Sequence, residues 1–105
     1  MPEKTIELNE ALKALELVIK EPEEGEQNFM IGFKLNPRPT DEQIEIYNAV
    51  IPQVLEGQGY KISKYPYLIN GNQVWEIFSP AREEQLERLI KEINQTAMEY
   101  AQFAV

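Results

Sequence analysis

The segment 65-YPYLINGNQVWEIF-78 decides the fold of this chain, because it encodes a tight β-hairpin. Its central Asn70-Gly71 is the strongest short hairpin signal, since both residue types accept the positive φ angles of a two-residue turn. The flanking strands are expected over residues 60–69 and 72–78. A two-residue turn brings three pairs of residues face to face: Tyr67 with Val74, Pro66 with Trp75, and Tyr65 with Glu76. Pro66 has no N–H to donate, so its strand should lie at a sheet edge or be irregular there.

Both faces of this hairpin are rich in apolar and aromatic residues. Because side chains alternate between faces, one face holds Tyr65, Tyr67, Val74 and Phe78, and the other holds Ile62, Leu68, Trp75 and Ile77. We expect one face to pack against helices and the other to present aromatic surface to a partner, since Tyr and Trp are favoured at interfaces. Two alternatives stay open: the N-terminal segment covers this second face, or the tyrosine hydroxyls simply reach water.

A second hairpin is expected upstream. Alternate positions of residues 29–35 are apolar, namely Phe29, Ile31, Phe33 and Leu35, which is typical of a strand. Residues 15–20 alternate in the same way, and the stretch 21–26, which contains Pro and Gly, indicates a turn or loop between the two strands. Residues 5–14 fit a short helix. One long helix over 6–20 is the competing interpretation, because short apolar runs are ambiguous.

Two longer helices follow the hairpins. Thr40 is a good N-cap residue and Gln43 completes a capping box, so the first helix should begin there. Pro52 is expected to kink or end this helix because it has no N–H to donate to the preceding turn, and the glycines within 57–59 should stop it. Ser79-Pro80 is expected to open the last helix, with Ser as the N-cap and Pro at the first helical position.

These elements predict a single α+β domain over residues 1–105, with a four-stranded antiparallel sheet from two hairpins and two main helices on one face. A short N-terminal helix is an option. The stretch Glu42-Gln43-Ile44-Glu45 resembles Glu84-Gln85-Leu86-Glu87, 42 positions later, which suggests that a ββα unit occurs twice as a pseudo-repeat. The alternative is chance, since Glu-Gln-aliphatic-Glu is a common way to begin a helix.

The composition excludes several classes of function. Acidic residues outnumber basic ones by 18 to 10, giving a formal charge of −8, which argues against binding to phosphate backbones or anionic membranes. The chain has no Cys and no His, so disulfides, thiolate metal sites, a Cys nucleophile and the commonest general base are all absent. No apolar run has the length of a membrane span and the N-terminus has no signal-peptide pattern, so we expect a cytoplasmic protein.

The remaining residues that could carry chemistry are weak candidates. Four glutamates lie within 21–26, but their spacing matches no dedicated calcium loop, so a solvated charged turn is favoured. Glu76 could have a raised pKa beside aromatic residues, yet a single carboxyl is not a catalytic pair. Ser63 and Lys64 are neighbours on a strand and point to opposite faces. The glycines within 57–59 follow a helix instead of opening one, so they bind no dinucleotide. We therefore predict no catalytic residues, no cofactor and no metal.

The leading expectation is a small non-enzymatic protein-binding or regulatory module that forms a homodimer. Its partners are expected to be a protein and a second copy of itself, with no nucleic acid and no membrane. The candidate partner-binding residues are the aromatic residues of the second hairpin and of the apolar C-terminal tail: Tyr65, Tyr67, Trp75, Tyr100 and Phe103. Two alternatives are an acidic protein that mimics nucleic acid and inhibits a DNA-handling protein, and a small enzyme that uses Glu or Tyr.

Overall fold

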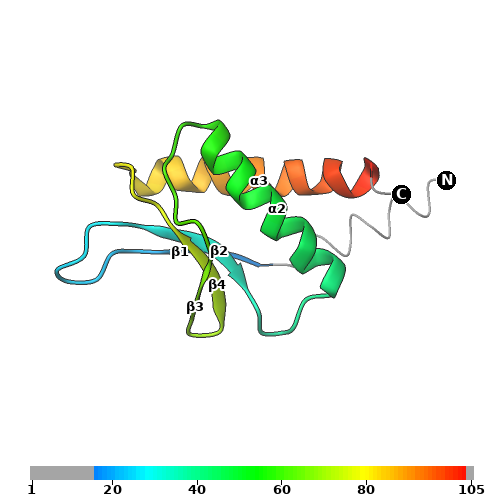
Figure 1. Ribbon diagram of the computed structural model, residues 1–105, viewed down its shortest axis with the longest axis horizontal. Helices are drawn as coiled ribbons and strands as arrows, with labels where there is room; N and C mark the ends of the chain where they lie inside the picture. Colours follow the sequence, from blue (N-terminus) through cyan, green and yellow to red (C-terminus); the bar gives the residue numbers. More distant parts are fainter. Residues whose placement is uncertain (1–15, 104–105) are drawn as a thin grey trace.

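The protein folds into one antiparallel sheet with two helices on one of its faces (Figure 1). This computed structural model describes residues 16–103, so the predicted helix over 5–14 lies outside the described residues. The elements in chain order are β1 (Leu17–Lys20), β2 (Met30–Lys34), α2 (Asp41–Gly57), β3 (Tyr67–Ile69), β4 (Asn72–Glu76) and α3 (Glu83–Phe103). The predicted α+β class, with two hairpins and two main helices, is confirmed. A single helix over 6–20 is wrong for residues 17–20, which form β1.

The sheet has the order β1-β2-β4-β3, so the second strand of each hairpin lies at the centre and the first strand lies at an edge. The central pair β2 and β4 runs antiparallel, with Ile31 opposite Trp75 and Gly32 opposite Val74. Ile31, Phe33 and Trp75 therefore share the face that meets the helices. This pairing joins the two hairpins into one sheet, although the paired residues, from Met30 with Glu76 to Lys34 with Asn72, are between 46 and 38 positions apart in sequence.

The core fills the space between this face and the helices. Its buried members come from both hairpins and both helices: Ile31, Phe33, Ile46, Tyr47, Val50, Ile51, Val54, Leu55, Trp75, Ile77, Leu86, Leu89, Ile93, Ala97 and Ala101. The Phe33 ring lies at the centre, with its centroid 5.9 Å from that of Tyr47 and 6.3 Å from that of Trp75. The buried Tyr47 hydroxyl donates a hydrogen bond of 2.9 Å to Asn94 Oδ1, which links α2 to α3.

The two ββα units follow the same plan, and their second strands and their helices begin at a common offset of 42 residues. β2 begins at Met30 and β4 at Asn72, while α2 begins at Asp41 and α3 at Glu83. Gly32 and Val74, which correspond at this offset, face each other directly in the central pair. An approximate two-fold axis therefore passes through this pair and exchanges the two units.

The helix N-termini repeat this equivalence. The Gln43 side chain accepts a hydrogen bond from the Thr40 amide at 2.8 Å, as the predicted capping box requires. The Gln85 side chain accepts one from the Arg82 amide at 2.9 Å, at the same place in the second unit. The last helix consequently begins at Glu83, and the prediction that Ser79 caps it is wrong. The Ser79 hydroxyl instead accepts a hydrogen bond of 2.7 Å from the Lys61 amide, beside the end of β4.

α2 does not end at Pro52 but continues to Gly57. The helix is closed by two backbone hydrogen bonds, from the Tyr60 amide to the Leu55 carbonyl and from the Gly59 amide to the Glu56 carbonyl. Gly59 has a φ of 90°, which makes this a Schellman ending with glycine at its left-handed position. The predicted stop at the glycines is therefore confirmed.

The second hairpin turns at Asn70-Gly71, whose φ angles of 50° and 76° fit the predicted two-residue turn. The predicted pair of Tyr67 with Val74 is confirmed, but the strand expected over 60–69 is interrupted before Tyr67. The predicted pairs of Pro66 with Trp75 and of Tyr65 with Glu76 are wrong, because residues 63–66 bulge from the sheet. Ser63 closes the gap: its amide donates to the Glu76 carbonyl and its hydroxyl accepts from the Glu76 amide.

Gly32 is required by the close approach of β2 and β4. A Cβ atom at this position would lie 1.9 Å from the backbone oxygen of Gln73. We predict that Gly32→Ala lowers the free energy of unfolding by about 3 kcal/mol or more, because the two central strands must separate to admit the methyl group. Gly57→Ala is the matched control, since a Cβ there meets nothing within 4 Å, and it should be neutral or mildly stabilising. Equal effects of the two substitutions in urea unfolding would contradict this role of Gly32.

Burial raises the pKa of Tyr47 to about 12, from the usual value near 10. Between these values the folded protein keeps a proton that the unfolded chain has lost, so stability falls as pH rises from 10 to 12. Tyr47→Phe removes the bond to Asn94 and should cost about 1 kcal/mol at pH 7. We predict that this difference from wild type shrinks or reverses at pH 11, measured by urea unfolding at both pH values. An unchanged difference would show that the hydroxyl is not protected by burial.

Candidate protein-binding surface

Exposed apolar side chains gather on the second hairpin. Of the five large hydrophobic residues exposed in the described part of the chain, four lie within residues 65–78. Tyr65, Tyr67, Leu68 and Phe78 have exposed fractions of 69%, 43%, 75% and 50%. We call these four residues the hairpin surface. They lie along the bulge, on the edge strand β3 and just after β4, where no further strand of the described sheet follows. Tyr67 and Leu68 are neighbours on β3 and therefore face opposite sides of the sheet.

The structure brings together some of the candidate residues and separates others. Tyr65 and Tyr67 are exposed on the hairpin surface, whereas Trp75 is 2% exposed and packs against Phe33 in the core. Trp75 therefore supports the hairpin from within and is not available for direct contact with a partner. Tyr100 is 47% exposed on α3, which places it on a different element. The side chain of Phe103 lies outside the described residues.

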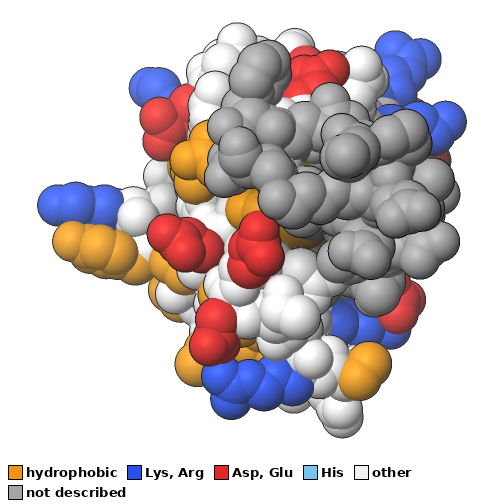
Figure 2. All heavy atoms as spheres, turned by 90° about the vertical axis from the view of Figure 1, so that its right-hand side faces the viewer, with side chains coloured by type: hydrophobic (Ala, Val, Ile, Leu, Met, Phe, Trp, Pro, Cys, Tyr) orange, Lys and Arg blue, Asp and Glu red, His pale blue; other side chains and the backbone are white. Residues whose placement is uncertain are grey.

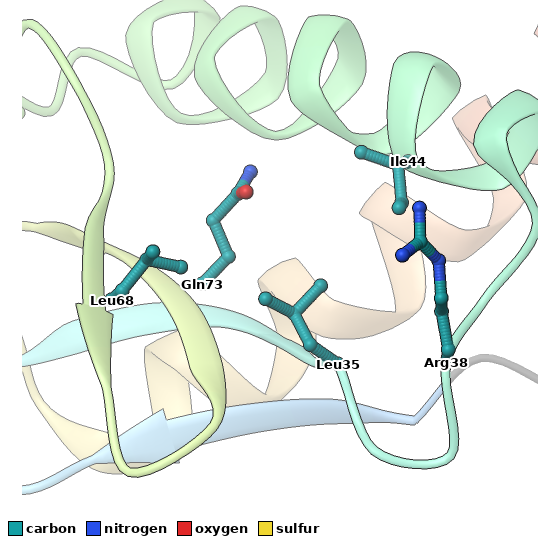
Figure 3. Close-up of a pocket in the computed structure, with 5 residues that line it drawn as sticks. All are labelled: Leu35, Arg38, Ile44, Leu68 and Gln73. Atoms are coloured by element: carbon teal, nitrogen blue, oxygen red, sulfur yellow. The ribbon is translucent and has the colours of Figure 1, made fainter.

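A cavity of about 340 Å³ opens between the second hairpin and the start of α2. It is lined by Leu35, Arg38, Ile44, Leu68 and Gln73 (Figure 3). Leu68 and Gln73 reach toward it from the hairpin, Leu35 from the end of β2, and Ile44 from α2, while Arg38 extends beside Ile44 (Figure 3). We call this cavity the hairpin pocket. Leu68, at its mouth, belongs to both the pocket and the hairpin surface.

The pocket walls are apolar, and its polar groups stand at the margin. Gln73 Nε2 donates a hydrogen bond to Asn48 Oδ1, which fixes the amide against α2. The Arg38 guanidinium lies 3.3 Å from Asp41 Oδ1, but both side chains are largely exposed, so this ion pair is weak. The Arg38 guanidinium thus keeps free donors at the pocket, and the site combines an aliphatic interior with one cationic group.

Sequence reasoning missed the pocket, because its lining comes from four separate segments. One signal was available in the repeat. At the offset of 42 residues, Gln73 corresponds to Ile31, so a polar residue occupies a position that is core in the other unit. A polar residue at a position that is apolar in the other unit of a repeat indicates that the core is packed less tightly around it.

The charge near the hairpin differs from that of the rest of the chain. Residues 58–82 contain three basic residues and one acidic residue, hence a net charge of +2, in a chain whose total is −8. Lys61 and Lys64 are exposed, and Lys64 Nζ lies 5.5 Å from the centroid of the Tyr65 ring. The acidic residue, Glu76, is half-buried and accepts a hydrogen bond of 2.8 Å from Asn28. The exposed charges of the hairpin are therefore cationic.

Acidic groups lie close together at one end of the molecule, where Glu21 of the β1–β2 loop is near Glu83 at the start of α3; this loop is at the left in Figure 1. The Glu21 carboxylate raises the pKa of Glu83 above its usual value, with a further contribution from Glu87. The face at the other end, shown in Figure 2, carries acidic, basic and hydrophobic side chains interspersed. The β1–β2 loop and the start of α3 therefore hold like-charged carboxylates close together.

Within residues 16–103, no group of three or more Asp or Glu side chains is placed to hold a metal ion. No helix in this range is long and apolar enough to cross a membrane. No protein-family model, no curated protein and no solved structure matches the chain.

Proposed function

We propose that this chain is a non-enzymatic binding module that recognises a protein partner through its second hairpin. The observation that carries the proposal is the gathering of four of the five exposed large hydrophobic residues within 65–78. Exposed apolar side chains that concentrate on one hairpin of a strongly charged domain are typical of a protein interaction site. Its aromatic content fits this use, because Tyr and Phe bring large contact areas with little loss of side-chain entropy.

The hairpin is better suited to contacts through side chains than to strand addition. β3 has only three residues, Tyr67–Ile69, and the preceding Pro66 has no N–H to offer to another strand. The bulge at residues 63–66 also turns the chain away from the regular ladder. A partner is therefore expected to pack against the exposed rings and Leu68 instead of extending the sheet.

The hydroxyl and carboxyl groups near the hairpin have structural partners, which supports a binding role over catalysis. Ser63 closes the bulge, Ser79 accepts from the Lys61 amide, and Glu76 accepts from Asn28. None of these three forms a pair of nucleophile and base with another described side chain.

Site-specific photo-crosslinking in the native host tests this proposal. A p-benzoylphenylalanine at position 65 is expected to give discrete adducts with another protein, because this side chain is 69% exposed on the hairpin surface. The matched control places the same group at the exposed Gln53 of α2. Substituting Tyr67 and Phe78 together by Ser should abolish the adducts. Equal yields at positions 65 and 53, or no adduct at 65, would overturn the proposal.

We also propose that the chain forms a homodimer through the C-terminal part of α3. Ala97 and Ala101 are buried on this helix, while Tyr100 presents a large ring that is 47% exposed. Two-fold dimers are the commonest oligomers, and an exposed aromatic residue on a helix suits such an interface.

Gel filtration with light scattering should show a dimer that Tyr100→Glu converts to monomer, because a charge in the centre of an apolar contact disrupts it. The neighbouring Glu99→Gln, which changes a charge without removing apolar surface, serves as the control and should remain dimeric. A wild-type protein that is monomeric at micromolar concentration would contradict the dimer.

A further inference from the structure

The hairpin pocket is the open counterpart of a closed part of the core. At the offset of 42 residues, its lining residues Leu35 and Ile44 correspond to Ile77 and Leu86. The latter two are fully buried, whereas Leu35 and Ile44 are only half-buried. Equivalent places on the two sides of the sheet therefore differ: the one that contains Ile77 and Leu86 is closed, and the one that contains Leu35 and Ile44 is open.

Two differences between the units keep the pocket open. Gln73 stands where the other unit has the fully buried Ile31, and its amide is drawn to Asn48 on α2. The edge residues also differ. Leu68, which faces Gln73 across the hairpin, is 75% exposed, whereas Ile19, which faces Ile31, is packed against the core. α3 contacts β1 over the closed side, while a cavity separates α2 from the hairpin on the open side.

We propose that the hairpin pocket binds an apolar side chain of a partner peptide, with a flanking Asp or Glu of that peptide contacting Arg38. This rests on the proposed function and names the chemistry of the partner segment. The aliphatic walls of Leu35, Ile44 and Leu68 match a Leu, Ile or Phe side chain. Such a side chain would complete here the packing that the chain's own residues complete at the equivalent closed site. Burying the exposed Leu68 removes a large apolar surface from water at the same step.

Charge complementarity selects an acidic partner segment. Arg38 stands at the pocket, and the exposed charges of the hairpin, Lys61 and Lys64, are cationic as well. A guanidinium can donate two parallel hydrogen bonds to a carboxylate, and this geometry makes the contact specific as well as attractive. Two copies of this chain that met pocket to pocket would bring the same cationic groups together. A single-stranded nucleic acid would match the charge but offers no aliphatic side chain for the pocket.

Peptide selection on the full chain tests this inference. Random dodecapeptides displayed on phage should yield sequences in which Leu, Ile or Phe stands beside Asp or Glu. With the most enriched peptide, fluorescence anisotropy should show that Leu68→Asp and Leu68→Ser each weaken binding about tenfold or more. Arg38→Glu should weaken it about fivefold, and replacing the acidic residue of the peptide by Lys should restore binding to this variant. Lys91→Glu, the same charge change at an exposed site on α3, should have no effect.

The outcomes separate this inference from the proposed function. Selection of basic peptides, absence of enrichment, or equal binding to the Leu68 variants would overturn the pocket, even where the adducts at position 65 persist. Binding of oligothymidylate that Leu68→Ser abolishes, or self-association lost in Leu68→Asp, would assign the pocket to a different occupant and reject the peptide. Loss of the adducts at position 65 together with intact peptide binding would instead reject the hairpin surface and keep the pocket.

Discussion

The antiparallel contact between β2 and β4 is the constraint on which the rest of the structure depends. Neither hairpin has a strand long enough to form a stable sheet alone, and the central pair joins them around Gly32 and Val74. The close approach at Gly32 aligns Ile31 with Trp75 on the helix-facing side, and this alignment sets where Phe33 meets Tyr47. Register, core and helix placement are thus consequences of one backbone contact.

The two units share a plan but differ in how completely they close. On one side of the sheet, Ile31 of the first unit and Ile77 and Leu86 of the second unit are fully buried, so this side is closed. On the other side, the polar Gln73 and the exposed Leu68 of the second unit face Leu35 and Ile44 of the first unit, and the cavity lies there. A near-symmetric fold of this kind lets one half supply stability while the other half retains a surface for recognition.

The parts of the fold that are encoded locally could be read from the sequence. Asn70-Gly71 fixed the hairpin turn, and Thr40 with Gln43 fixed the start of α2, because each acts through neighbouring backbone groups. Ser63 and Ser79 could not be placed in this way, since their hydroxyls bond to strands distant in sequence. The burial of Trp75 and the pocket also depend on packing between units. The sequence therefore identified the hairpin as the region of interest without distinguishing its supporting residues from its exposed ones.

The connection between the two units begins with the Schellman ending at Gln58–Tyr60. This connection has a consequence for how the sheet is held together. Each unit alone would present the open side of a central strand, which is satisfied by the strand of the other unit. Separating the two units would therefore expose the inner edges of β2 and β4 at once, and holding both units in one chain keeps these edges paired. Gly59, with its φ of 90°, allows the tight turn with which this connection begins.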